Sequence, residues 1–455
     1  MHFIDNKTIA DSLKRRPSRK HLAGIFERAK QRKGLHPEDV GILANIDDPE
    51  LINKMQKVAG LIKNEIYGNR LVLFAPLYIS NYCINDCIYC GFHSSNNLKR
   101  IKLDMEQIRL QTEYIINMGH KRVLLEAGEH PDNTIDYVLD AIRTIYRTKT
   151  DKGNIRRVNV NIAATSEENY EKLKLAGIGT YQLFQETYHY DTYRKIHKGP
   201  KRNYDRQLYA HHRAMKAGID DVGMGVLFGL YDYKYELVAL IMHARELERR
   251  FGVGPHTISV PRWRPAKGVS PESAPYPVSD MDFLKIISII RMAVPYTGII
   301  ISTREPVELR RVAFSIGVSQ ASAGSCTSPG GYSSKYDPEN SYGQFTLYDT
   351  RSLDKVVLDC LKSGLLPSFC TACYRKDRTG EKFMSLAKPG DINKLCTPNA
   401  ILTFKEYLLD YASDVTRKEG EKFIEHMLDG MDKKTKGLLI KLLNTVHAGK
   451  RDVYI

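Results

Sequence analysis

Arg70-Leu-Val-Leu-Phe-Ala-Pro-Leu-Tyr-Ile-Ser-Asn-Tyr-Cys-Ile-Asn-Asp-Cys-Ile-Tyr-Cys-Gly-Phe92 is the stretch on which the interpretation of this 455-residue sequence depends. Its first half, Arg70–Leu77, is a short apolar run that predicts a buried strand. Its second half holds Cys83, Cys87 and Cys90 in the spacing Cys-x3-Cys-x2-Cys. Three thiolates on one loop can hold three irons of a 4Fe–4S cluster, and the fourth iron then has no protein ligand. The stretch therefore predicts a strand followed by a cluster whose open iron takes part in chemistry.

A zinc site is the alternative that this loop leaves open. Zinc takes four ligands, and His93 could supply the fourth beside the three cysteines. Zinc sites usually use Cys-x2-Cys pairs, so the observed spacing favours an iron–sulfur cluster. Disulfides are not expected, because eight cysteines are few for this length and six of them fall into two motifs.

Eight short apolar runs alternate with amphipathic stretches between residues 69 and 330. This alternation predicts β/α units, and eight such units predict an α/β fold, a closed (β/α)8 barrel of the TIM type. In the first unit, Asp104 is placed to cap a helix that ends at Gly119. The expected strands are Arg70–Leu77, Arg122–Ala127, Arg157–Ala163, Tyr181–Gln185, Asp221–Phe228, Thr257–Pro261, Ile299–Thr303 and Val318–Ser322.

Two segments of different pattern flank the barrel. Apolar residues at helical spacing follow Asp47-Asp48-Pro49, so residues 1–68 predict a helical N-terminal extension. A loop rich in Gly, Ser, Pro and Asn spans 329–343, and a mostly helical C-terminal domain is expected over 331–455. We therefore predict three parts, with the barrel at 69–330 in the middle.

The C-terminal domain carries a second cysteine motif. Cys370 and Cys373 form Cys-x2-Cys, and Cys396 follows after 22 residues without an intervening histidine. A structural zinc site would lack an obvious fourth ligand, so a second open-iron 4Fe–4S cluster is favoured. Two such clusters in one chain argue against simple electron transfer.

Two expected strands favour a barrel with a usable interior. Gly223, Gly225 and Gly229 leave one face of the fifth strand without side chains. Asn159 and Asn161 alternate with aliphatic residues in the third strand, and polar groups inside a barrel need partners such as a bound polar ligand. The alternative is that these asparagines face a helix.

Composition limits the compartment and the partners. No uncharged apolar stretch of about 18 residues exists, so no membrane span is expected, and a reducing cytoplasm fits the cysteine usage. The net charge of +15 raises nucleic-acid binding as an option. Basic residues are scattered apart from runs at Lys14–Lys33 and Lys433–Arg451, which favours a solvated surface, or an acidic protein partner, over nucleic acid.

The first motif resembles the signature of the radical S-adenosylmethionine (SAM) enzymes. In that family the open iron binds the amino and carboxylate groups of SAM, and an electron from the cluster cleaves the sulfonium to give a 5′-deoxyadenosyl radical. Ala127-Gly128-Glu129 at the end of the second strand resembles the family's Gly-Gly-Glu, with alanine in first place. The resemblance implies SAM as cofactor and a radical SAM barrel.

Further matches extend over nearly the whole chain and resemble the HydG family, tyrosine lyases that mature FeFe hydrogenase. A related tyrosine lyase of thiamine-thiazole biosynthesis shares the barrel and the first motif but lacks the second. The second motif therefore decides between the two families. The matching stretches are Tyr181–His189, Gly254–Arg262, Ser319–Ser325, Phe369–Arg375, Leu386–Gly390 and Phe404–Tyr407.

This resemblance implies a carbon–carbon lyase that cleaves tyrosine to p-cresol and dehydroglycine. Dehydroglycine then yields carbon monoxide and cyanide, which bind a fifth, mononuclear iron with a cysteine ligand beside the second cluster. The product would be an Fe(CO)2(CN) synthon for the hydrogenase. The implied partners are tyrosine, free cysteine, a reducing electron donor and a maturation scaffold protein.

The resemblance also implies roles for single residues. His256 would hold the fifth iron, and because it precedes the sixth strand we expect the two clusters at opposite mouths of the barrel, joined by a lumen. Arg304 would bind the tyrosine carboxylate, since a guanidinium fork matches a carboxylate; a pair with Glu305 is the alternative. The full set is Cys83, Cys87, Cys90, Cys370, Cys373, Cys396 and His256 for metal, Phe92, Ala127, Gly128, Glu129, Asn161, Glu186 and Arg206 for SAM, and Gln182, Arg304 and Ser322 for tyrosine.

One position departs from the family pattern. Cys326 stands where the family usually has an arginine, so any part that this arginine plays in anchoring the substrate would pass to Arg304 or Arg310. Two other functions stay open on the sequence alone. One is a tyrosine lyase that stops at dehydroglycine for thiazole synthesis, and the other is an iron–sulfur carrier or scaffold.

Overall fold

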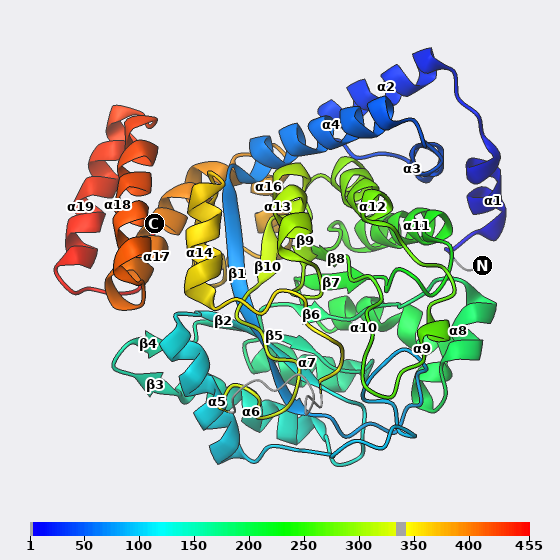
Figure 1. Ribbon diagram of the computed structural model, residues 1–455, viewed down its shortest axis with the longest axis horizontal. Coiled ribbons are helices and arrows are strands. Elements are labelled where there is room, and N and C mark those ends of the chain that lie inside the picture. Colours follow the sequence, from blue (N-terminus) through cyan, green and yellow to red (C-terminus); the bar gives the residue numbers. More distant parts are fainter. Residues whose placement is uncertain (1–2, 334–342) are drawn as a thin grey trace.

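Eight parallel strands close into a barrel in the computed structural model, which describes residues 3–333 and 343–455 (Figure 1). The barrel closes because β10 pairs with β1, and this confirms the predicted (β/α)8 fold. The strands in barrel order are β1 (Arg70–Ser80), β2 (Arg122–Ala127), β5 (Arg157–Asn161), β6 (Tyr181–Gln182), β7 (Val222–Gly225), β8 (Thr257–Ser259), β9 (Gly298–Ile301) and β10 (Gln320–Ser322).

Helices follow the strands and cover the outside of the barrel, as the alternating pattern predicts. The first, α5 (Met105–Met118), begins at a capping box of Asp104 and Gln107 and ends at Gly119, whose φ of 108° is left-handed. A small hairpin, β3 (Lys149–Thr150) and β4 (Gly153–Asn154), interrupts the second unit. The other helices of this part are α6 (Ile135–Arg147), α7 (Glu167–Leu175), α8 (Tyr190–Ile196), η1 (Pro200–Arg202), α9 (Tyr204–Leu208), α10 (Ala210–Lys216), α11 (Tyr233–Phe251), η2 (Pro271–Ser273), α12 (Asp280–Ala293) and α13 (Val307–Ile316).

Four helices precede the barrel, in agreement with the expected N-terminal extension. The longest begins behind Asp48 and Pro49 as predicted, and its apolar face packs on α12 and α13. The four helices are α1 (Asn6–Lys14), α2 (Arg19–Lys30), α3 (Pro37–Ala44) and α4 (Pro49–Tyr67).

The C-terminal segment is mostly helical but contributes one strand that the sequence did not suggest. β11 (Leu366–Ser368) pairs in parallel with the first residues of β1, Arg70–Val72, at the end of the barrel where the strands begin. Only three residues long and containing Pro367, it has no recognisable strand pattern. The helices are α14 (Leu353–Lys362), α15 (Ala372–Arg375), α16 (Gly380–Ala387), α17 (Ile392–Asp410), α18 (Asp414–Asp429) and α19 (Lys433–His447).

The division of the chain at 68/69 and 330/331 stays a prediction. Through β11, the C-terminal part is hydrogen-bonded to the barrel sheet. The expected loop over 329–343 lies partly outside the described residues. In the two described ranges, no helix combines the length and the apolar character that crossing a membrane requires.

A buried ion pair holds α13 to the loop after β10, and this pair gives a test of the fold. Arg310 pairs with Asp349, both side chains are fully buried, and Arg310 Nη2 donates to Ser322 O at 2.6 Å. Arg310→Met leaves Asp349 buried with Arg351 as its remaining charged partner, so it should lower the free energy of unfolding by about 2 kcal/mol. The neighbouring Arg311 pairs with Asp359 at 2.7 Å but is 45% exposed, so Arg311→Met should cost less than about 1 kcal/mol.

Urea unfolding of the two variants and the wild type, followed by circular dichroism, measures the difference. Equal unfolding midpoints for the two variants would contradict this account of the Arg310 pair.

Candidate functional site

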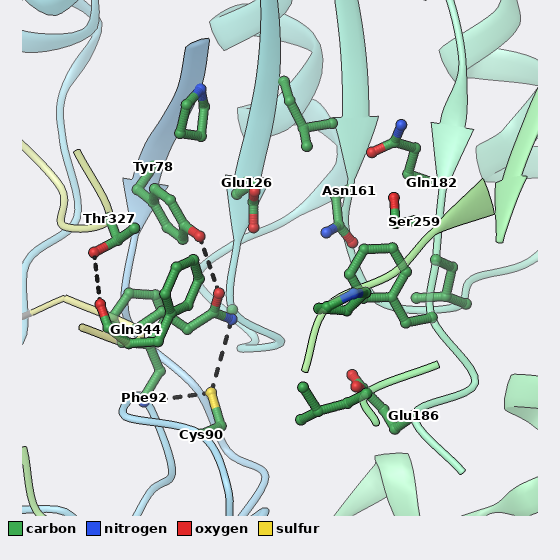
Figure 2. Close-up of a pocket in the computed structure, with 18 of the residues that line it drawn as sticks. Tyr78, Cys90, Phe92, Glu126, Asn161, Gln182, Glu186, Ser259, Thr327 and Gln344 are labelled. Carbon is green, nitrogen blue, oxygen red and sulfur yellow. Dashed lines mark hydrogen bonds between the residues drawn. The ribbon is translucent and has the colours of Figure 1, made fainter. Parts of the chain in front are cut away.

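A large pocket lies at the end of the barrel where the parallel strands finish, which is where barrel enzymes place their active sites. Its wall combines the cysteine loop with side chains from the strands. Figure 2 shows Tyr78, Glu126 and Asn161 on strands, with Cys90 and Glu186 further along the direction in which the strands run. Among the residues predicted for SAM or tyrosine, those in the wall are Phe92, Ala127, Gly128, Glu129, Asn161, Gln182, Glu186, Arg304 and Ser322.

The loop after β1 brings Cys83, Cys87 and Cys90 into this wall, and all three are free thiols. Cys90 Sγ accepts hydrogen bonds from Phe92 N at 3.4 Å and from Gln344 Nε2 at 3.8 Å. Donors aimed at a cluster sulfur stabilise its negative charge. The loop thus presents three ligands, one of them already supported by donors.

Burial of these thiols decides what can bind there. Burial raises the pKa of the Cys90 thiol to about 11, and it raises the pKa of Cys87 as well. Such thiols give up their protons when a metal takes the place of the proton. Three cysteines of one loop in the same pocket wall, with no fourth ligand, therefore fit a 4Fe–4S cluster with one open iron.

The glycine after β2 is required by close packing against the cysteine loop. A Cβ on Gly128 would lie 2.4 Å from Tyr82 O. The next residue, Glu129, accepts from Asn85 Nδ2 at 2.7 Å and from Arg206 Nη2 at 2.6 Å. Arg206 itself is not among the described residues of the pocket wall, but its partner Glu129 is, and its role toward SAM stays a prediction.

Glu186 sits in a strained backbone conformation at the pocket, with a φ of 68°. Its carboxylate pairs with Lys201 Nζ at 2.8 Å, and Lys201 N donates to Asn85 Oδ1 at 2.8 Å. Burial alone would lower the pKa of Lys201, but Glu186 and Cys87 raise it above its ordinary value, so the lysine stays charged beside the cysteines. The sequence analysis missed Lys201, although it lies in a run of basic residues that could have drawn attention.

Arg304 reaches the pocket with a guanidinium that forms no hydrogen bond or ion pair within the described residues, and it lies 3.4 Å from the centre of the Phe345 ring. Glu305, the alternative partner considered from the sequence, pairs instead with Arg262 at 2.7 Å and with Arg264 at 2.5 Å. A charged fork without a protein partner is available to an anionic ligand.

A half-buried carboxyl in the pocket wall was not anticipated. Glu126 is the last residue but one of β2, and desolvation raises its pKa to about 7. The hydroxyl of Tyr78 lies in the same wall and donates to Gln344 Oε1 at 2.9 Å (Figure 2). The only sequence signal for Glu126 was its place one residue before the Ala127 turn.

The barrel interior below the pocket is polar, as predicted from the third strand. Asn161 lines the pocket, and Asn159 accepts from Arg157 Nε at 2.7 Å and from Thr180 N at 3.1 Å, so neither faces a helix. A Cβ on Gly223 would lie 2.5 Å from Thr257 Oγ1 and 2.7 Å from Gln182 Cγ. The absence of a side chain at Gly223 therefore makes room for the side chains of Thr257 and Gln182.

A second pocket lies at the opposite mouth, where the strands begin. It is lined by Cys370, Cys373 and Cys396 together with His256. β11 places Cys370 there, and α17 supplies Cys396. A hydrogen bond with Cys373 lowers the pKa of Cys396 to about 7, so these two sulfurs are neighbours.

His256 has the surroundings of a metal ligand. Its Nδ1 lies 3.4 Å from Asp221 Oδ1, and its Nε2 lies 3.4 Å from the hydroxyl of Tyr374. Burial holds the pKa of His256 well below its ordinary value, so the imidazole is neutral, the form that binds metals. Asp221 and Tyr374 were not found from the sequence.

Three arginines surround this second pocket. Each is the first residue of a strand, and all three side chains are buried: Arg70, Arg122 and Arg157. Arg122 Nη2 donates to Cys370 O at 2.9 Å, while Arg70 Nε and Arg157 Nη1 have no hydrogen-bond partner in the described chain. Their positive charge suits a site that holds three thiolates.

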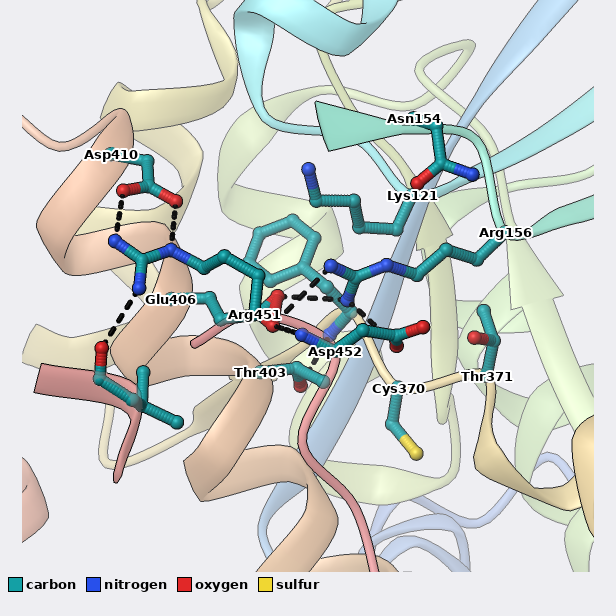
Figure 3. Close-up of polar contacts among 12 residues, drawn as sticks. Lys121, Asn154, Arg156, Cys370, Thr371, Thr403, Glu406, Asp410, Arg451 and Asp452 are labelled. Carbon is teal, nitrogen blue, oxygen red and sulfur yellow. Dashed lines mark hydrogen bonds and ion pairs between the residues drawn. The ribbon is translucent and has the colours of Figure 1, made fainter. Parts of the chain in front are cut away.

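An ion-pair network covers the outer side of the second motif (Figure 3). Arg156 pairs with Glu406 at 2.8 Å and with Asp452 at 3.3 Å, and Arg451 pairs with Asp410 at 2.6 Å. In Figure 3 the sulfur of Cys370 points away from this network. The last residues of the chain are thus fastened beside the cysteine pocket.

The two pockets share no lining residue among those described. The first pocket has a small apolar cluster of its own in its wall, formed by Phe74, Leu124 and Ile300. The pockets lie at opposite mouths as the position of His256 suggested, and the expected lumen between them stays a prediction.

The two remaining cysteines lie outside both pockets. Cys326 is buried with its sulfur 3.3 Å from Ser328 Oγ, and Cys360 is buried in α14. Arg310, considered as a substitute anchor for substrate, is taken up by Asp349.

Comparison with known proteins identifies families and relatives that this chain resembles. A family model described as the radical SAM superfamily matches residues 77–243, and the model of the biotin and thiamin synthesis associated domain matches residues 259–366. The 2-iminoacetate synthase of Salmonella typhimurium is 30% identical over 361 residues, 78% of this chain and 92% of that protein.

Solved structures give matches over more of the chain. A crystal structure described as HydG, a maturase of the FeFe hydrogenase, is 53% identical, covers 100% of both chains and superposes with a TM-score of 0.96. HydG from Carboxydothermus hydrogenoformans is 41% identical over 93% of this chain and 94% of its own, with a TM-score of 0.82.

The two three-cysteine pockets predict two independent clusters. Replacing Cys83, Cys87 and Cys90 by alanine should remove about four irons and four sulfides per chain, and so should replacing the second triad. Iron and acid-labile sulfide analysis of anaerobically reconstituted protein measures the loss.

Cys360→Ala provides the matched control, because this buried thiol belongs to neither pocket, and it should retain about eight irons. Loss of all iron from either triple variant would show that the sites are not independent.

Proposed function

The chain belongs to the radical SAM superfamily and, within it, to the HydG maturases of FeFe hydrogenase, and from this premise we propose that it cleaves tyrosine to p-cresol and dehydroglycine. Each dehydroglycine is then converted to one carbon monoxide, one hydrogen cyanide and one water. Two turnovers therefore supply the two carbonyls and the one cyanide of an Fe(CO)2(CN) synthon, with a second cyanide left over. The observation that carries the proposal is the pair of three-cysteine pockets at opposite mouths of one barrel, the first with an unpaired arginine.

The first pocket binds SAM and tyrosine together. When bound, the cluster and SAM supply a 5′-deoxyadenosyl radical that takes a hydrogen atom from the tyrosine amino group. Ala127, Gly128 and Glu129 receive the methionine end of SAM beside the cysteine loop, which leaves the strand side of the cavity for tyrosine. Both ligands then lie within one pocket, and together they exclude water from the reactive radical.

Tyrosine is oriented by charge. Arg304 binds its carboxylate through the fork that no described carboxylate occupies, and Ser322, whose Oγ accepts from Thr303 N at 3.1 Å, lies beside it. Glu126, with a pKa of about 7, can take a proton from the substrate ammonium near neutral pH and so present the neutral amine. Gln182 contributes an amide deeper in the barrel.

The second pocket completes the reaction. Its three cysteines would hold a second 4Fe–4S cluster, and His256 would hold an additional iron, which would supply coordination sites for free cysteine, carbon monoxide and cyanide. The Tyr374 hydroxyl lies 3.4 Å from Nε2 of the imidazole and Asp221 lies 3.4 Å from its Nδ1, and the buried arginines offset the negative charge of the thiolates. A reducing electron donor and a maturation scaffold protein are the partners that this sequence of steps requires.

A lyase that stops at dehydroglycine is the second candidate, favoured by the 30% identity to a 2-iminoacetate synthase. That match covers 78% of this chain, whereas the HydG match covers all of it. The second cysteine pocket has no part in a reaction that ends at dehydroglycine, so we favour the longer reaction.

Loss of the second triad separates these two reactions. Cys370→Ala/Cys373→Ala protein should form p-cresol at the wild-type rate but lose carbon monoxide, because the first pocket is intact. Anaerobic incubation with SAM, tyrosine and dithionite, with p-cresol measured by chromatography and carbon monoxide by haemoglobin binding, tests this. Undiminished carbon monoxide from the variant would contradict the proposed role of the second pocket. If wild-type protein formed neither deoxyadenosine nor p-cresol, the lyase reaction would be excluded and an iron–sulfur carrier would be the remaining function.

Arg304→Ala should raise the KM for tyrosine by about 100-fold, since a charge-assisted bidentate pair is worth about 3 kcal/mol. The KM for SAM should change little. Arg264→Ala is the control, because Arg264 pairs with Glu305 and is not among the described residues of the pocket wall. Equal effects of the two variants on the KM for tyrosine would remove Arg304 from its proposed position.

A further inference from the structure

A basic segment lies directly against the loop that carries the first cysteine triad. The segment is Arg194-Lys-Ile-His-Lys-Gly-Pro-Lys-Arg202, with five Lys or Arg among nine residues and no acidic residue. Arg194, Lys195, Lys198 and Arg202 are exposed. In the sequence this segment was not set apart from the other scattered basic residues.

Backbone contacts fix this segment to the cysteine loop. Ile88 N donates to Ile196 O at 3.2 Å, and Lys201 N donates to Asn85 Oδ1 at 2.8 Å. A Cβ on Gly199 would lie 3.0 Å from Ile84 O. The charges of the segment therefore stand at the edge of the loop itself.

Two apolar side chains of the loop are exposed beside these charges. Ile84 follows Cys83 and is 38% exposed, while Ile88 follows Cys87 and is 39% exposed. Cys87 itself is only 5% exposed. A protein seated on the two isoleucines would contact residues that directly follow two of the three cysteines in the loop.

We propose that the docking patch, formed by Ile84, Ile88, Arg194, Lys195, Lys198 and Arg202, binds a small acidic iron–sulfur protein of the ferredoxin class that reduces the first cluster. The inference rests on the proposed function, which requires one electron for each SAM cleaved. An apolar centre with a charged rim is the usual design of a transient protein interface, and electron-transfer interfaces are among the smallest. Positive charge at the rim steers an acidic partner to the place where the electron enters.

The acidic groups around the patch leave its charge positive. Asp86 pairs with Lys198 at 3.2 Å and accepts a hydrogen bond from Ser95 Oγ, and Glu186 pairs with Lys201. Asp191 and Asp205 are exposed at the two ends of the segment. With Lys198 and Lys201 paired to Asp86 and Glu186, three further basic residues stand against these two carboxylates, so the segment keeps a positive charge.

The electron transfer is balanced without any other reactant. One electron leaves the reduced ferredoxin and enters the first cluster, so the ferredoxin is oxidised by one electron and no proton moves. Ile84 and Ile88 exclude water between the partners, which strengthens the electrostatic attraction at the rim.

The test variant is Arg194→Glu/Lys195→Glu/Arg202→Glu, which spares Lys198 and Lys201 and their ion pairs. The control is Lys433→Glu/Lys434→Glu/Lys441→Glu, which makes the same charge change at exposed positions of α19. Each protein, loaded with clusters and checked by iron content, is mixed with a pre-reduced acidic bacterial ferredoxin freed of dithionite, and cluster reduction is followed by electron paramagnetic resonance. Binding of redox-inactive, gallium-substituted ferredoxin is measured by calorimetry.

We expect the test variant to be reduced by ferredoxin at least about tenfold more slowly at low salt and to bind it correspondingly more weakly. The wild-type rate should fall as salt rises from 50 to 300 mM, and the control should match wild type. Reduction by titanium(III) citrate, which needs no docking, should be equal in all three.

The docking proposal would be contradicted if ferredoxin reduced the test variant at the wild-type rate. It would also be contradicted if the control variant lost as much of this rate as the test variant. These outcomes are independent of tyrosine cleavage, because they are read from cluster reduction and from binding. If the titanium-reduced wild type formed no p-cresol, the proposed function would fail while the docking result stood.

Discussion

The parallel pairing of β1 with three other strands fixes both candidate sites. β10 bonds to Val72–Phe74 of β1, β2 to its second half, and β11 to its first three residues. All eleven residues of β1 are buried, which explains why the stretch is apolar from Leu71 to Leu77. The first cysteine loop leaves the end of β1, and β11 brings the second motif to its beginning. One strand therefore sets the two cysteine motifs at opposite mouths.

The second requirement is the balance of buried charge. Each pocket gathers three thiols, and their burial is unfavourable for thiolates unless positive groups lie near. At the first mouth Lys201 is held by Glu186, and Arg304 has no protein partner among the described residues. At the second mouth the cations are three arginines at strand beginnings. Both mouths are thus prepared for anionic occupants by different side chains.

Much of this was accessible from the sequence, and the reasons are physical. The barrel strands and α5 follow from apolar periodicity and capping residues, which act locally. The strand-end residues could be placed because parallel strands all finish at one mouth. The same rule applied to strand beginnings would have grouped Arg70, Arg122 and Arg157, since three predicted strands start with arginine.

Other features depend on contacts between distant segments and had no local signal. β11 is too short and carries Pro367, and only pairing with β1 makes it a strand. Gln344 reaches Cys90 from 254 positions away, and Tyr374 reaches His256 from 118. Arg206, expected as a SAM contact by resemblance, donates to Glu129, which lies 77 positions earlier in the chain.

The high net charge gains a local meaning from this placement. A charge of +15 by itself bears on solubility and unspecific association. The run from Arg194 to Arg202 differs from the other basic runs because backbone hydrogen bonds fix it to the cysteine loop. A cluster that must be reduced needs a surface where a partner can come close, and of the three cysteines Cys87 is buried while Cys83 and Cys90 are partly exposed. Exposed isoleucines between the cysteines, with fixed positive charge around them, provide such a surface beside the cysteine loop.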